Sequence, residues 1–112
     1  MPPKKNPLNL NPLQLKTLTL LQEIARLENS PAEGEDGAFV ITSLPHAHGN
    51  HFHLGPWVVS GKDATGLQND GVWAALIRKG LIKSEPGKAI VTAAGLGYDT
   101  GLRDSILHGS DH

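Results

Sequence analysis

Four histidines lie close together in the segment Pro45-His46-Ala47-His48-Gly49-Asn50-His51-Phe52-His53. If Gly49-Asn50 is the two-residue turn of a β-hairpin, the first and second pairs of histidines lie on facing strands. Side chains alternate along a strand, so all four imidazoles would share one face, with cross-strand neighbours about 4.5–5.5 Å apart at Cβ. Two or three imidazoles could then bind one divalent ion, with water completing the shell, and imidazole ligation suits zinc, nickel or copper. The sequence therefore predicts a candidate metal site made by His46, His48, His51 and His53.

The same cluster also fits a polar surface, or a pH-sensitive patch whose members repel one another once they are protonated. The closest acidic residue, Asp36, is ten residues upstream, so no carboxylate stands near enough in the sequence to act as a general base. The chain contains no cysteine, which excludes disulfides, thiolate metal ligands and cysteine nucleophiles. We therefore expect a protein that is not an enzyme and requires no cofactor, with divalent-metal binding left open for the histidines.

The composition limits the partners that the chain can have. Its 112 residues suffice for one domain, and a net charge of −1 argues against indiscriminate coating of nucleic acid. Residues 62–88 carry five basic and three acidic residues, whereas residues 27–61 carry four acidic residues and no basic one. The N-terminus lacks an apolar leader, and no run approaches the roughly 18 apolar residues of a membrane helix. We expect a cytoplasmic protein that makes no membrane contact.

The first element that must position these residues is a long helix. Asn11 as N-cap and Pro12 at the first helical position, followed by apolar residues at helical spacing, predict a helix over residues 12–28. Residues 1–10 contain three prolines and two lysines and are expected to be a flexible arm. The domain itself is expected to cover residues 11–104.

Strands are expected on both sides of the histidine cluster and again near the end of the chain. The β-branched and aromatic residues of 39–44 predict a strand, and residues 52–59 predict a second one that is interrupted by Gly55-Pro56. The turn Glu85-Pro86-Gly87 joins the segments on either side of it as a short hairpin.

Two further helices are expected in the second half of the chain. The first begins near Thr65, or near Asp70 if the next glycine breaks it, and Gly80 fits the left-handed position just past its end. Thr92 caps the second helix, which is weakened by the glycines that follow. Residues 105–112 are expected to be a frayed tail.

Two stretches resemble the winged helix-turn-helix domains of small bacterial transcription regulators. Ala75-Leu76-Ile77-Arg78-Lys79-Gly80-Leu81-Ile82 is similar to the end of their recognition helix, and Val91-Thr92-Ala93-Ala94-Gly95 is similar to their wing strand and the Thr-x-x-Gly after it. The resemblance covers about residues 65–96 and implies a single α+β domain of winged-helix-like architecture. The strand-like residues 52–59 stand where such domains have their second helix, so the histidine-rich hairpin is an addition to that architecture.

This resemblance implies a transcriptional regulator that binds duplex DNA, with the helix in the major groove and the hairpin on the adjacent backbone. Gln68 and Asn69 would then read bases, since both side-chain amides can make paired contacts with adenine. The basic residues at the helix end and on the hairpin would hold phosphates, namely Arg78, Lys79, Lys83 and Lys88. A homodimer is expected, because two-fold operators are commonly read by paired modules. The alternative is a non-enzymatic protein-interaction or metal-sensing module that uses the histidine cluster.

Overall fold

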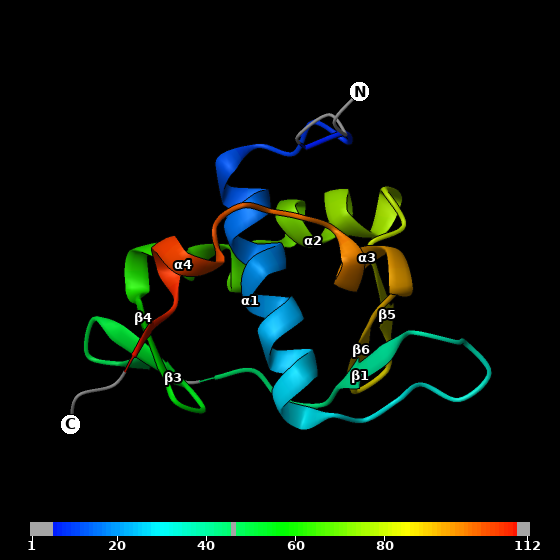
Figure 1. The fold of residues 1–112 in the computed structure, drawn as a ribbon, viewed down its shortest axis with the longest axis horizontal. Coiled ribbons are helices and arrows are strands. Elements are labelled where there is room, and N and C mark those ends of the chain that lie inside the picture. Colours follow the sequence, from blue (N-terminus) through cyan, green and yellow to red (C-terminus); the bar gives the residue numbers. More distant parts are fainter. Residues whose placement is uncertain (1–5, 46, 110–112) are drawn as a thin grey trace.

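A long helix runs between two small antiparallel sheets in the computed structural model, which describes residues 6–45 and 47–109 (Figure 1). In chain order the helices and strands are α1 (Pro12–Glu28), β1 (Phe39–Ile41), β2 (Ala47–His48), β3 (His51–Leu54), β4 (Trp57–Ser60), the 3₁₀ helices η1 (Gly61–Asp63) and η2 (Thr65–Gln68), α2 (Asp70–Arg78), β5 (Ile82–Glu85), β6 (Lys88–Val91), α3 (Ala93–Gly97), α4 (Arg103–Ile106) and β7 (His108–Gly109). The first sheet has the strand order β1-β6-β5, and the second has the order β2-β3-β4-β7. The predicted single domain of the α+β class is confirmed.

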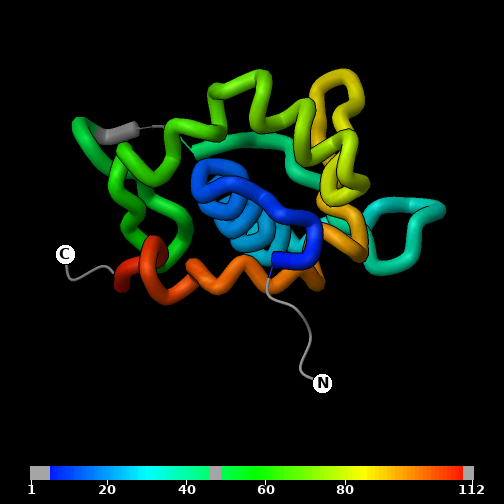
Figure 2. The backbone as a smooth tube through the Cα atoms, turned by 90° about the horizontal axis from the view of Figure 1, so that it is seen from above, coloured from blue at the N-terminus to red at the C-terminus, as the bar shows by residue number. Residues whose placement is uncertain are grey.

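The predicted helix over residues 12–28 is confirmed as α1, and the rest of the chain is wrapped around it (Figure 2). The Asn11 side chain accepts a hydrogen bond from the Gln14 amide at 2.8 Å, and the Gln14 side chain accepts one from the Asn11 amide at 2.9 Å. These two reciprocal bonds fix the first turn of the helix. Residues 17–25 are buried without a break, so α1 is covered on all sides and exposes no polar face over this length.

The start of α2 is set by a side-chain cap. Of the two predicted starts, the helix uses the later one, at Asp70. The Asn69 side chain accepts a hydrogen bond from the Val72 amide at 3.1 Å, and residues 65–68 form the separate helix η2. The glycine after Asp70 lies in the first turn, where its conformational-entropy cost is offset by the Asn69 cap.

The end of α2 and the hairpin after it follow the sequence prediction. Gly80 has φ +77°, and the amides of Gly80 and Leu81 donate to carbonyls of the last helical turn at 3.0 and 3.1 Å. This pair of bonds through a left-handed residue ends the helix and turns the chain into β5. The β5-β6 hairpin reverses at Pro86-Gly87, and β6 lies between β5 and β1.

The strands around the histidine cluster differ in part from the prediction. The first strand is shorter, covering only Phe39–Ile41 of residues 39–44. The predicted interrupted strand over residues 52–59 is wrong: β3 and β4 are two strands of a hairpin. Leu54 faces Trp57 in the register, so Gly55-Pro56 forms the turn between them, and Gly55 adopts φ +55° there. The predicted turn at Gly49-Asn50 is confirmed, since His48 pairs with His51.

Both chain ends pack onto the domain wherever the structure describes them. The flexible arm predicted for residues 1–10 is wrong from Asn6 onward, because the Asn6 side chain bonds to Leu10 and Tyr98, and Leu10 is 4% exposed. The predicted frayed tail is wrong up to Gly109. Ile106 is buried at the end of α4, and β7 then pairs with β4. Residues 1–5 and 110–112 lie outside the described residues.

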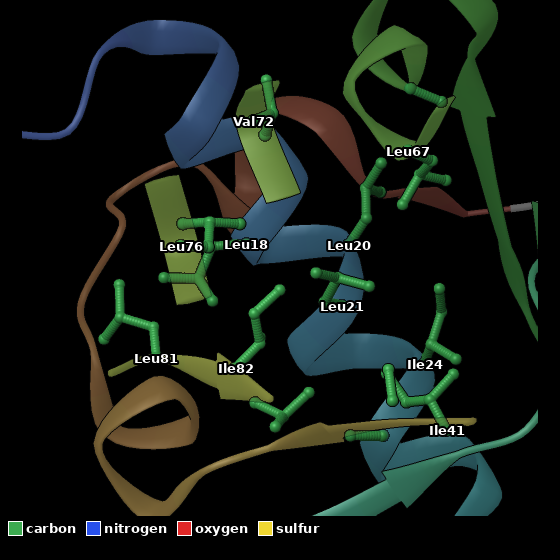
Figure 3. Packing of buried hydrophobic residues seen from close by; sticks show 14 of the residues in the cluster. Leu18, Leu20, Leu21, Ile24, Ile41, Leu67, Val72, Leu76, Leu81 and Ile82 are labelled. Atoms are coloured by element: carbon green, nitrogen blue, oxygen red, sulfur yellow. The ribbon is translucent and has the colours of Figure 1, made fainter. Parts of the chain in front are cut away.

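The hydrophobic core gathers around the middle of α1 (Figure 3). Leu18, Leu20 and Leu21 of α1 are at most 1% exposed. They meet residues from α2, from the first sheet and from the segment before α2, namely Leu67, Val72, Leu76, Leu81, Ile82, Ile41 and Val91. One core thus holds α1, α2 and the β1-β6-β5 sheet together, and Leu54 and Val59 bring the second sheet into the same cluster.

Candidate functional site

The exposed side of α2 together with the β5-β6 hairpin forms the first candidate surface, called here the helix–hairpin surface. The structure brings the six residues predicted to contact DNA to this surface or its edge: Gln68, Asn69, Arg78, Lys79, Lys83 and Lys88. Gln68 and Arg78 are exposed. Asn69 caps α2 through its Oδ1 atom, so this atom is engaged within the helix.

The lysines of this surface have intramolecular partners. Lys83 Nζ lies 2.6 Å from Glu35 Oε1, and Lys88 Nζ lies 3.4 Å from Glu85 Oε1. Lys79 Nζ donates to the carbonyl of Leu8 at 3.0 Å, so it also holds the N-terminal segment. Both ion pairs are solvent-exposed, and such pairs are worth about 0–1 kcal/mol. The lysines are therefore partly neutralised but are not locked in place.

An apolar groove runs beside the same surface, between α2 and the hairpin. Its volume is about 400 Å³, and its lining includes Leu44, Trp73, Ile77 and Ala89, with Asp70 and Lys88 as its charged members. Ile77 is 40% exposed and lies next to the partly exposed Trp73 in this lining, so the groove presents apolar surface to solvent. Sequence reasoning missed this groove because its walls come from segments that are far apart in the chain.

The second candidate surface is one face of the β2-β3-β4-β7 sheet, called here the histidine face. It carries His51 and His53 from β3, Val58 and Ser60 from β4, and His108 from β7. The Nε2 atoms of His51 and His53 lie 3.1 Å apart, and the rings are nearly perpendicular at 80° with centroids 4.8 Å apart. The register thus brings His108 to this face. Its position was not predicted, because residues 105–112 were expected to be a frayed tail.

The predicted four-histidine site is only partly tested by these positions. His46 and the side chain of His48 lie outside the described part of the chain, although the backbone of His48 pairs with His51. Among the residues that are described, no group of three His, Cys, Asp or Glu side chains is placed to hold a metal ion. Two of the four predicted ligands are therefore brought together.

Comparison of the chain with protein-family models, with curated proteins and with solved structures gave no match. Across the described residues, no helix combines the length and the apolar character that a membrane crossing requires. The argument for a function therefore rests on the geometry of the two surfaces.

A buried carboxylate connects the two halves of the molecule. Glu23 of α1 is 4% exposed, and its carboxylate accepts a hydrogen bond from Trp57 Nε1 at 2.9 Å and pairs with Arg103 and, at 3.5 Å, with Arg26. The Arg103 guanidinium also lies over the Trp57 ring, 5.5 Å from its centroid. Burial alone would raise the pKa of Glu23, but the hydrogen bonds from Arg103 and Trp57 and the nearby positive charges lower it instead.

This cluster of Glu23, Trp57 and Arg103, called here the Glu23 anchor, joins α1 to β4 and α4. No sequence pattern indicated it, since Arg103 follows Glu23 by 80 residues. The Glu23 carboxylate and the Trp57 indole N–H are both used in internal contacts, and we assign the cluster a structural role.

Proposed function

We propose that the chain is a non-enzymatic DNA-binding protein of winged-helix-like architecture, acting as a transcriptional regulator. The observation that carries the proposal is the unit α2-β5-β6, a short helix followed directly by a hairpin, in a sheet of order β1-β6-β5. A winged-helix domain needs this order of helix and wing, with the strand before the helix completing the sheet. In the proposed complex α2 lies in the major groove and the β5-β6 hairpin follows the phosphate backbone.

The positions of the charges support this placement. Arg78 is exposed at the C-terminal end of α2, and Lys83 and Lys88 lie on the two strands of the hairpin, with side chains 55% and 44% exposed. All three cations are exposed or half-exposed and belong to the unit α2-β5-β6, and in the proposed complex they bind phosphates. Gln68, just before α2, is exposed and supplies an amide for a base edge.

The acidic partners of the lysines set the expected strength of binding. Glu35 and Glu85 must release their lysines before these can bind phosphates, at a cost of about 0–1 kcal/mol for each exposed pair. Because the acidic groups stay close to the duplex, they also repel it. We therefore expect weak non-specific affinity at physiological salt, with sequence recognition depending on a second copy of the chain bound to the other half of a two-fold site.

The test is fluorescence anisotropy with a labelled duplex of mixed sequence, titrated with the full chain between 50 and 200 mM salt. Four phosphate contacts, from Arg78, Lys79, Lys83 and Lys88, predict a slope of log K against log salt of about −3 to −4. Lys83→Ala should reduce the slope by about 1. Glu85→Gln should strengthen binding, because it removes both a competitor for Lys88 and a negative charge.

The matched control is Lys62→Ala. Lys62 is also an exposed lysine, but it lies in η1, beside the sheet at the opposite end of the molecule from the hairpin (Figure 1). Its loss should leave the affinity and the salt slope unchanged. Absence of binding with micromolar protein at 50 mM salt, or an equal effect of Lys62→Ala and Lys83→Ala, would overturn the proposal.

A second candidate function is a protein contact made by the same surface, with an apolar side chain of the partner in the groove beside α2. The exposure of Ile77 and the partial exposure of Trp73 favour it, since DNA contacts would leave this apolar area without a role. The two functions are separated by Ile77→Ser, which should leave DNA affinity and salt slope almost unchanged but remove a protein contact that uses the groove.

A further inference from the structure

We propose that His51 and His53 form a two-histidine chelate for a divalent transition-metal ion, with water completing the coordination. This site is independent of DNA binding, because it lies on the histidine face and uses none of the residues of the helix–hairpin surface. The two ligands are residues i and i+2 of β3, which places both side chains on the same face of the strand.

The distance between the two ring nitrogens carries the proposal. With metal–nitrogen bonds of about 2.0–2.1 Å, two imidazoles on one ion hold their nitrogens about 2.9 Å apart at a right angle and about 3.3 Å apart at the tetrahedral angle. The Nε2–Nε2 distance of 3.1 Å lies between these values. The separation of the two nitrogens therefore already matches that of two imidazoles on one ion.

Without a metal ion, the same spacing suits a hydrogen bond between the two imidazoles. One neutral imidazole can donate its Nε2 proton to the Nε2 atom of the other, and the 3.1 Å distance suits such a hydrogen bond. A divalent ion takes the place of this shared proton, which leaves to the solvent while the Nδ1 atoms keep or gain theirs. Metal binding therefore requires a tautomer change but no rearrangement of the strand.

The surroundings of the pair leave room for the remaining ligands. His53 is exposed and His51 is partly exposed. An open hollow of about 320 Å³ lies beside His51, lined by Asn50, Val58, Ser60 and His108. The solvent-exposed side of His53 leaves space for water molecules bound to the ion. Because the ligands so placed are imidazoles, Cu²⁺ should bind most tightly, ahead of Ni²⁺ and Zn²⁺.

His108 provides a matched control on the same face. Val58 pairs with both His53 and His108, so the two histidines face the same side but are separated by two strand spacings, about 10 Å. His108 lies on the edge strand β7, is exposed, and belongs to no three-residue metal group among the described residues. Its replacement should therefore test whether binding is specific to the β3 pair or belongs to histidines in general.

The experiment titrates ZnCl₂ into the full chain and follows the imidazole resonances by NMR, with CuCl₂ titrations followed by electron paramagnetic resonance. Zinc should shift the resonances of His51 and His53, and the copper spectrum should show at least two nitrogen ligands. His53→Gln and His51→Gln should each weaken zinc binding at least tenfold, whereas His108→Gln should change it less than twofold. Circular dichroism and thermal unfolding of each variant check that these surface changes leave the fold intact.

Unchanged His51 and His53 resonances at millimolar zinc would overturn the proposal and leave the pair as a hydrogen-bonded surface feature. So would a loss of affinity in His108→Gln as large as that in His53→Gln. The NMR result on the unchanged chain does not depend on any variant, and neither result bears on the salt-dependent binding of DNA, so the two proposals can fail separately.

Discussion

The two sheets of this domain are held in different ways. In the β1-β6-β5 sheet, Ile82, Ile90 and Val91 are all at most 7% exposed, and the strands pack directly on the core. In the β2-β3-β4-β7 sheet, Leu54 and Val59 reach the same core, but Phe52, Trp57 and Val58 are only partly buried. The second half is therefore the thinner one, since a smaller share of its described strand residues is fully buried. Regions with fewer buried apolar contacts open more easily, and ligand sites are often found there.

The difference also separates the two proposed functions. The helix–hairpin surface stands on the tightly packed half, which suits a rigid element that must fit the groove of a duplex. The histidine face stands on the thinner half, where bound metal would add stability that the packing does not supply. The Glu23 anchor is what ties the second half to the first.

Gly95→Ala should produce the largest loss of stability, because the added methyl group would collide with the backbone of the tightly packed half. A Cβ atom at Gly95 would lie 2.0 Å from the Leu81 carbonyl oxygen, a backbone atom with little freedom to move. We expect a loss of about 3 kcal/mol or more in urea unfolding, at the upper end of overpacking effects. Gly97→Ala in the same short helix is the control, since nothing lies within 4 Å of its added Cβ. Equal losses in the two variants would contradict this packing account.

Ile106→Ala should weaken the thinner half by a smaller amount. Ile106 is 3% exposed and belongs to the same core cluster as the middle of α1. Its truncation should cost about 2–3 kcal/mol, the lower part of the range for such changes, because a site in the thinner half can collapse around the cavity. Hydrogen exchange should show faster opening of β4 than of β6. An equal increase in both strands would mean that the two halves open as one unit.

The predictions from sequence succeeded where a feature depends on neighbouring residues and failed where it depends on contacts between distant segments. The bounds of α1, the Gly80 helix end and the turns at Gly49-Asn50 and Pro86-Gly87 depend on neighbouring residues, and all four are confirmed. The second sheet depends on contacts over long separations. Nothing near His108 indicates that it pairs with Val58, 50 residues earlier, so the segment was predicted to be a frayed tail.

The candidate sites divide in the same way. The positions of the lysines on the hairpin follow from the turn between its strands and were predictable. Their acidic partners were not all predictable, because Glu35 reaches Lys83 across 48 residues of sequence. The groove beside α2 and the Glu23 anchor are products of tertiary packing and have no local signature in the sequence.

Glu23→Gln should weaken the link between the two halves. The carboxylate is buried, and replacing it removes the charge that pairs with Arg103 while keeping an acceptor for Trp57. We expect a loss of about 1.5–2 kcal/mol at pH 7, the lower part of the range for hydrogen bonds to charged groups. Glu33→Gln, at an exposed loop position, should change the stability by less than about 0.5 kcal/mol. Urea unfolding of both variants measures the difference.

The pH dependence of this effect has a definite sign. The pKa of Glu23 in the folded chain is below its ordinary value of 4.5, so the folded state favours the ionised form. The resulting stability is present above pH 4.5 and is lost as the pH falls through the lower, folded-state pKa. The stability difference between the unchanged chain and Glu23→Gln should therefore shrink on acidification below pH 4.5. A difference that stays constant down to pH 2 would exclude a charged anchor.

Two left-handed glycines offer the finest comparison of the halves, because their local strain is the same and only their surroundings differ. Gly80 has φ +77° at the end of α2, Gly49 has φ +69° at the tip of the β2-β3 hairpin, and an added Cβ meets nothing within 4 Å at either position. An alanine in this conformation costs about 1 kcal/mol. Gly80→Ala should show the full cost in urea unfolding, since its strain persists until the core opens. Gly49→Ala should cost less, because the tip of the thinner sheet can open locally and release the strain while the core stays folded.

Gly80→Asn is the control, because asparagine tolerates the left-handed region. It should recover most of the stability lost in Gly80→Ala and so separate backbone strain from any other effect of the alanine side chain. If Gly49→Ala proves as costly as Gly80→Ala, the second sheet unfolds only with the core, and the contrast between the two halves is one of exposure and not of stability.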